Sequence, residues 1–74
     1  MPHVGARARI VHFGGGFERG VVLAMHEEGR RLEVRGERGD VLEFVLSPAT
    51  ARFVSAAGVH GPRLELPGDH RRSL

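Results

Sequence analysis

Arginine side chains at strand spacing are the residues of this sequence best suited to binding chemistry. A guanidinium presents its N–H donors as a planar fork that fits phosphate or carboxylate oxygens. Aliphatic side chains between the arginines could contact a sugar or the apolar surface of a protein. The candidate binding residues are Arg7, Arg9, Arg19, Val21, Met25, Arg31 and Arg35. The alternative interpretation is an ordinary solvated sheet face.

A glycine-rich loop is the second candidate. It consists of Phe13, Gly14, Gly15, Gly16 and Phe17. Two aromatic rings with an arginine nearby could hold a base or a peptide. The alternative is a hairpin tip whose phenylalanines close the end of the core. The glycines lack the spacing that cradles nucleotide phosphates at the start of a helix.

Catalysis, metal binding and cofactor binding find no support in the sequence. The five histidines lack a metal-ligand spacing, and there is no cysteine. No serine stands in a recognisable nucleophile motif. We therefore expect a non-enzymatic binding module with no metal ion and no cofactor.

Composition narrows the class of protein further. The 74 residues carry a formal net charge of +2, and all 11 basic residues are arginine, a usage that a high-GC genome also favours. No apolar run approaches the roughly 20 residues of a membrane span, and the first residues do not resemble a signal peptide. We expect one small cytoplasmic domain with no membrane contact.

A β-hairpin over residues 30–46 is the clearest sign of the scaffold that would position these side chains. Apolar and polar residues alternate along both of its arms, which is typical of strands with one buried face. Its loop ends at Gly39, which we expect at positive φ because glycine has no Cβ. The resulting register puts Leu32 opposite Phe44, with both side chains in the core.

A hairpin around the glycine-rich loop precedes it. Its strands are predicted over residues 6–13 and 18–26. The expected register brings Ile10 opposite Gly20 and keeps the even-numbered side chains on the buried face.

The loop over residues 27–29 joins these two hairpins and has the same form as the loop over residues 37–39. Gly29 is therefore expected at positive φ, with Ala24 opposite Leu32. This register also orders the outward-facing side chains in rows. One row holds Arg9, Val21, Arg35 and Val41, and another holds Met25, Arg31 and Val45.

The remaining segments complete a small all-β fold. Pro48 interrupts the pattern after the fourth strand because proline cannot donate to a sheet. The segments are a 3-10 turn over 47–50, strands over 51–55 and 63–66, and flexible ends over 1–5 and 67–74. Five to six short antiparallel strands should curl into a closed barrel, which removes the exposed edges. We predict a single SH3-like small barrel over residues 6–66.

A spaced set of glycines and aliphatic residues runs through residues 5–33. Its members are Gly5, Ala8, Ile10, Gly14, Gly15, Gly16, Gly20, Val21 and Val22. This spacing resembles the KOW motif of ribosomal proteins and transcription elongation factors, whose fold is this type of barrel. The resemblance implies contact with RNA or a ribosome, although the lysines that such motifs often carry are absent.

Two classes of partner are therefore open. The first is a nucleic acid or ribonucleoprotein, bound by the arginine-bearing sheet face. The alternative is a protein partner or a homodimer, held by an apolar stripe on the same face. That stripe consists of Val21, Leu23, Met25, Val41 and Val45.

Overall fold

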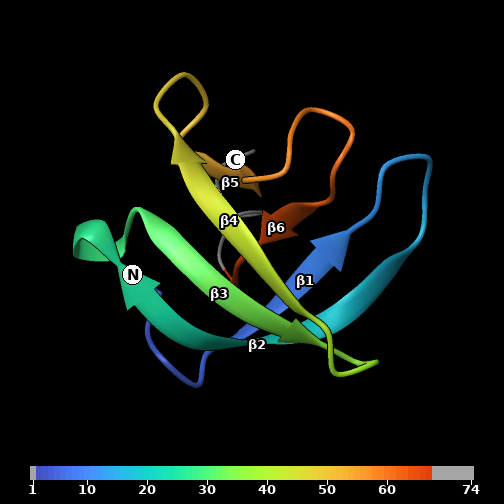
Figure 1. Cartoon of the computed structure of the whole chain (residues 1–74), viewed down its shortest axis with the longest axis horizontal. Helices are drawn as coiled ribbons and strands as arrows, with labels where there is room; N and C mark the ends of the chain where they lie inside the picture. Colours follow the sequence, from blue (N-terminus) through green and yellow to red (C-terminus); the bar gives the residue numbers. More distant parts are fainter. Residues whose placement is uncertain (1, 68–74) are drawn as a thin grey trace.

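Within residues 2–67, each strand pairs antiparallel with the next along the chain, and the sixth pairs back to the first, so that the sheet closes into a barrel (Figure 1). The computed structural model describes residues 2–67. The elements are β1 (Arg7–Val11), β2 (Phe17–His26), the 3-10 helix η1 (Glu27–Gly29), β3 (Arg31–Gly36), β4 (Val41–Ser47), β5 (Arg52–Ser55) and β6 (Arg63–Glu65). The predicted all-β antiparallel barrel is confirmed, and the topology is consistent with an SH3-like small barrel. The predicted flexible tail lies, beyond Pro67, outside the described residues.

The core fills the inside of the barrel with side chains from all six strands. Leu32 and Phe44 lie opposite each other and are fully buried, as predicted. Burying a side chain of this size contributes about 1.5–3 kcal/mol to folding. The buried core residues are Ile10, Val22, Leu32, Val34, Phe44, Phe53 and Leu64.

The β3–β4 hairpin has the predicted register and turn. The Gly36 N–H donates to the Asp40 carbonyl at 2.9 Å, and the Gly39 N–H donates to the Gly36 carbonyl at 3.0 Å. Gly39 has a φ of 90°, which confirms the positive value expected at the end of this loop.

The β1–β2 hairpin is shifted by two residues from the prediction. Ile10 lies opposite Glu18 rather than Gly20, which pairs with Ala8. The reason is the loop, whose three glycines all have positive φ and let the chain turn back between His12 and Gly16. Because a slip of two residues preserves the alternation of a strand, the even-numbered side chains still face the core.

The β2–β3 pairing is interrupted by a β-bulge between Val22 and Ala24. Val22 lies opposite Val34 as predicted, but beyond the bulge Met25 lies opposite Leu32. The prediction that Ala24 faces Leu32 is therefore wrong. The bulge adds one residue to β2, which brings Met25 against the core.

The loop after β2 differs from the loop after β3. Glu27, Glu28 and Gly29 have φ values of 54°, 60° and 86°, so three consecutive residues are left-handed. The positive φ predicted for Gly29 is confirmed, whereas the matching form of the two loops is wrong. This segment is the 3-10 turn of the described chain.

The 3-10 turn predicted over residues 47–50 is thus in the wrong place. The chain there forms a wider turn in which the Ala51 N–H donates to the Ser47 carbonyl at 2.8 Å. Ala51 closes it at a φ of 59°.

Candidate functional site

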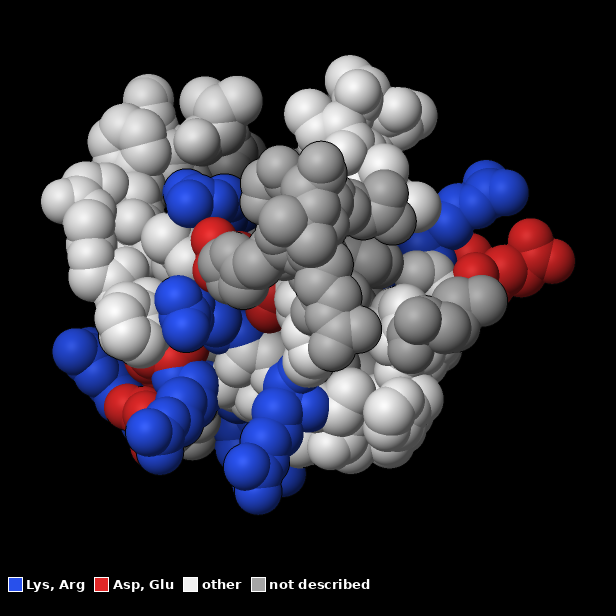
Figure 2. All heavy atoms as spheres, turned by 180° about the vertical axis from the view of Figure 1, so that it is seen from behind, with Lys and Arg blue, Asp and Glu red and all other residues white. Residues whose placement is uncertain are grey.

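A groove on the outer surface of β1 and β2 collects several of the predicted binding residues. It has a volume of about 790 Å³ and extends to the end of β6. Figure 2 shows arginine side chains gathered on this side of the molecule. Its lining includes Arg7, Arg9, Phe17, Arg19, Val21 and Glu65, and we call it the arginine groove.

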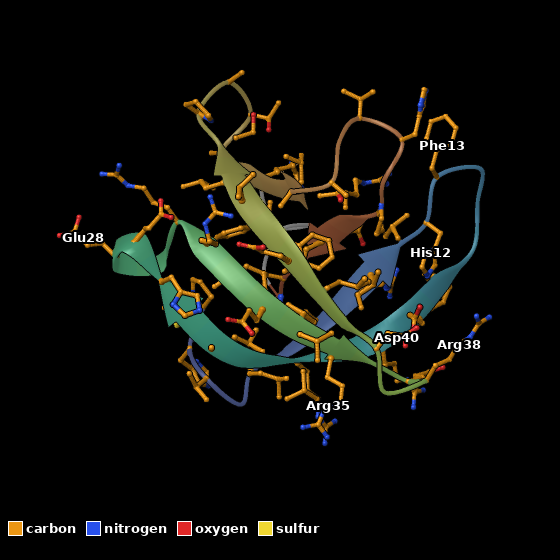
Figure 3. All side chains as sticks on the ribbon, viewed as in Figure 1. His12, Phe13, Glu28, Arg35, Arg38 and Asp40 are labelled. Atoms are coloured by element: carbon orange, nitrogen blue, oxygen red, sulfur yellow. The ribbon has the colours of Figure 1, made fainter. Side chains whose placement is uncertain are left out.

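Strand pairing brings arginines to both sides of Val21. This residue of β2 lies opposite Arg7 of β1 and, on its other side, opposite Arg35 of β3. Arg35 stands beside the groove and points away from the barrel (Figure 3). The predicted row had Arg9 in the place of Arg7, and the slip of β1 accounts for the difference.

The next row places two like charges directly opposite each other. Arg9 pairs with Arg19 of β2 on one side and with Glu65 of β6 on the other. Like charges at directly opposed positions destabilise a sheet. Glu65 offsets part of this repulsion, since its Oε1 lies 3.7 Å from Nη1 of Arg9, but its other oxygen lies 3.6 Å from Arg63.

Three guanidinium groups of this surface have no acidic partner within residues 2–67. No ion pair in that part of the chain involves Arg7, Arg19 or Arg35. Their N–H donors are therefore available to an anion, and the planar fork favours phosphate or carboxylate oxygens.

The two phenylalanines of the glycine-rich loop occupy different places. Phe17 lines the groove, is 63% exposed and lies under the Arg9 guanidinium, whose carbon is 4.6 Å from the ring centroid. Phe13 is labelled in Figure 3 and is 69% exposed. Its ring and that of His60 from the β5–β6 loop lie edge to face, with their centroids 4.8 Å apart. Neither ring closes the core. The intervening glycines border open space, since a Cβ on any of them would meet no atom within 4 Å.

The structure places two predicted binding residues elsewhere. Met25 packs against the core because of the bulge in β2. Arg31 is held by Glu43 and by Glu27, whose carboxylate accepts a hydrogen bond from Arg31 Nε at 2.8 Å. These two carboxylates, Glu43 first, raise the pKa of Arg31. Its charge is neutralised there and is not presented to the groove.

The predicted apolar stripe is broken into separate residues. Val21 is 43% exposed and Val41 is 51% exposed. The other predicted members, Leu23, Met25 and Val45, are half-buried. Among these described residues the apolar surface is not continuous, because Arg35 lies between Val21 and Val41.

A second, smaller pocket of about 320 Å³ lies at one end of the barrel. Its lining includes His12, Glu18, Arg38, Asp40 and Pro62. Figure 3 labels His12, Arg38 and Asp40 at this end of the barrel. The sequence pattern does not reveal this pocket, because it forms where separate hairpins meet.

The Glu18 carboxylate lines this pocket and contacts both neighbouring hairpins, and we call it the carboxylate clamp. The Glu18 carboxylate lies 2.6 Å from His12 Nε2 and accepts the Glu37 N–H at 2.9 Å. It lies over Gly36, where a Cβ would come within 2.4 Å of its Oε1. The hydrogen bond from His12, followed by that from Glu37, lowers the pKa of Glu18. The clamp ties the end of the first hairpin to the second.

Other classes of site are not seen in the described part of the chain. Residues 2–67 contain no group of three or more His, Cys, Asp or Glu side chains placed to hold a metal ion. The same residues form no helix long and apolar enough to cross a membrane. No protein-family model matches this chain, and no curated protein or solved structure matches it either.

Proposed function

We propose that this chain is a non-catalytic module that binds nucleic acid through the arginine groove. One observation carries the proposal: Arg9 and Arg19 lie directly opposite each other, next to Arg7. A sheet gains nothing for its own folding from such a pair. A polyanion bound in the groove would attract both guanidinium groups and so offset their mutual repulsion.

The distribution of charge supports a local rather than a global attraction. The net charge of the whole chain is only +2. In contrast, the described residues that line the groove include three arginines and one acidic residue, Glu65. Phosphate contacts in the groove would therefore supply most of the affinity for nucleic acid, and this affinity should fall steeply as the salt concentration rises.

The test is fluorescence anisotropy with labelled oligonucleotides over a series of salt concentrations. If the three arginines of the lining and the neighbouring Arg35 each neutralise one phosphate, the slope of log K against log salt should be about −3 to −4. Arg35→Glu should weaken binding and make the slope shallower by about 1. Arg30→Glu is the matched control, because Arg30 precedes β3, whereas Arg35 lies within β3 opposite Val21 of the groove lining, and both variants undergo the same change of charge.

Two outcomes would contradict the proposal. One is the absence of binding to any oligonucleotide at low salt. The other is an equal loss of affinity in Arg30→Glu and Arg35→Glu, which would show that net charge matters and the groove does not.

A protein partner is the second candidate, favoured by the exposure of Val21 and Val41 on the same face. In that case Val21→Ser, which leaves the charge unchanged, should weaken binding more than Arg35→Gln. Self-association would also appear in analytical ultracentrifugation as a mass that rises with protein concentration in the absence of nucleic acid.

A further inference from the structure

The exposed ring of Phe17 is the feature of the arginine groove that phosphate binding leaves unexplained. Phe17 is the first residue of β2 and lies opposite Val11, and its ring is 63% exposed. A phenylalanine in water adds nothing to the core, and the groove needs no aromatic ring to attract an anion.

Arg9 prepares this ring for stacking. Its guanidinium carbon lies 4.6 Å from the ring centroid. The same guanidinium forms an ion pair with Glu65 of the neighbouring strand β6. A cation over an aromatic face is favourable, so Arg9 stabilises the position of the Phe17 ring from one side. Most of the Phe17 surface stays exposed to solvent. An open, backed ring is a platform on which a planar base can stack.

The arginines that surround the platform are placed to hold the backbone on either side of a stacked base. Arg19 lies opposite Arg9, and Arg7 is two residues before Arg9 on the same face of β1. Within residues 2–67 neither makes an ion pair. A groove that combines free cations with an exposed ring resembles the way proteins bind single strands, in which the groove follows the backbone and aromatic rings take the bases.

We propose that the arginine groove takes single-stranded nucleic acid, with one base stacked on Phe17 and the neighbouring phosphates held by Arg7 and Arg19. The inference rests on the proposed function and narrows its ligand. The bases of a duplex already stack on one another and pair, so only their edges face the grooves. The Phe17 ring would then have no base to stack on.

The chain provides a matched control for Phe17. Phe13 lies on the same hairpin and is similarly exposed, but it lines no part of the groove and its ring meets His60. Each phenylalanine can be replaced by alanine, and each by tryptophan. Because the natural chain contains no tryptophan, a single introduced indole reports on its own surroundings.

The experiment measures the affinity of each variant for a labelled oligo-dT strand, an oligo-U strand of equal length and a duplex containing the same dT strand. We expect the single strands to bind more tightly than the duplex at equal salt. Phe17→Ala should weaken single-strand binding about 5- to 150-fold and change duplex binding less than about twofold. Phe13→Ala should change both less than about twofold. Phe17→Trp should keep the affinity, and its fluorescence should be quenched by the strand, unlike that of Phe13→Trp.

The results separate the failure of this inference from that of the proposed function. If neither single strands nor duplex bind at low salt, nucleic-acid binding itself is refuted. If the duplex binds as tightly as the strands, or if Phe17→Ala leaves single-strand binding unchanged, the groove binds nucleic acid without stacking and this inference alone is overturned.

Discussion

Gly20 offers the sharpest test of the packing inside the barrel. It is buried in β2, and a Cβ built on it would lie 2.7 Å from Cγ1 of Val34 and 3.1 Å from Cδ1 of Ile10. The Arg35 carbonyl oxygen, which belongs to the backbone of the paired strand, would be 3.3 Å away. Its backbone is outside the left-handed region, so Gly20→Ala introduces no backbone strain.

The expected cost follows from two opposing effects. Adding a methyl group to a packed core typically costs about 1–3 kcal/mol, because the neighbours must move from their preferred rotamers. Replacing glycine by alanine also restricts the unfolded chain, which returns about 0.4–1 kcal/mol. We therefore expect Gly20→Ala to lower the free energy of unfolding by about 1–2 kcal/mol. A loss of 1 kcal/mol corresponds to a fall in Tm of roughly 4–8 °C for a domain of this size.

Urea unfolding followed by circular dichroism measures the effect, and a double-mutant cycle with Val34→Ala identifies its cause. Removing the Val34 methyl groups relieves the closest contact, so the double variant should be more stable than the sum of the two single losses by about 0.5–3 kcal/mol. A Gly20→Ala variant as stable as the natural protein, or strict additivity in the cycle, would refute this account of the core.

Three further predictions concern stability. Phe44→Ala should lower the free energy of unfolding by about 3–5 kcal/mol, which is as much as the core of so small a domain usually supplies, and a folded variant with an unchanged urea midpoint would contradict the central place of that ring. Gly39→Val should cost of order 1–2 kcal/mol, because valine strains at a φ of 90°, and an unchanged Tm would show that the turn readily changes shape. His12 holds the pKa of Glu18 below its ordinary value of 4.5, so the contribution of this carboxylate to stability is present above that pH and is lost as the pH falls through the lowered pKa. Thermal unfolding between pH 6 and pH 3 should therefore be less pH-dependent in Glu18→Gln, and parallel curves for the two proteins would count against the clamp.

The parts of the fold that could be predicted are those fixed by local chemistry. The β3–β4 hairpin has one glycine that needs a positive φ, at Gly39, and alternation on both sides of it, so only one register satisfies both. The first hairpin has three adjacent glycines, and each of them can take a positive φ. The alternation of apolar and polar residues then excludes a register shift by an odd number of residues, but it does not exclude a shift by two.

The candidate site was predictable as far as it depends on strand alternation. An outward position for Arg7, Arg9 and Arg19 follows from the period of two. The bulge that brings Met25 against the core inserts one residue into β2 between Val22 and Ala24, and strand alternation alone does not reveal such an insertion. The place of Glu65 beside Arg9 depends on closure between distant strands.

Closure of the barrel also has a kinetic consequence. The contact between β1 and β6 joins strands near opposite ends of the described chain, and the entropy of closing so long a loop makes such pairing a late step in folding. Arg9 and Glu65 meet only through this contact, so the complete arginine groove exists only in the closed barrel. A ligand bound there would stabilise the closed form by mass action, by about 2.7 kcal/mol at a free concentration one hundred times its Kd. Amide hydrogen exchange in β6 would then slow as the groove fills, which makes β6 a reporter of binding.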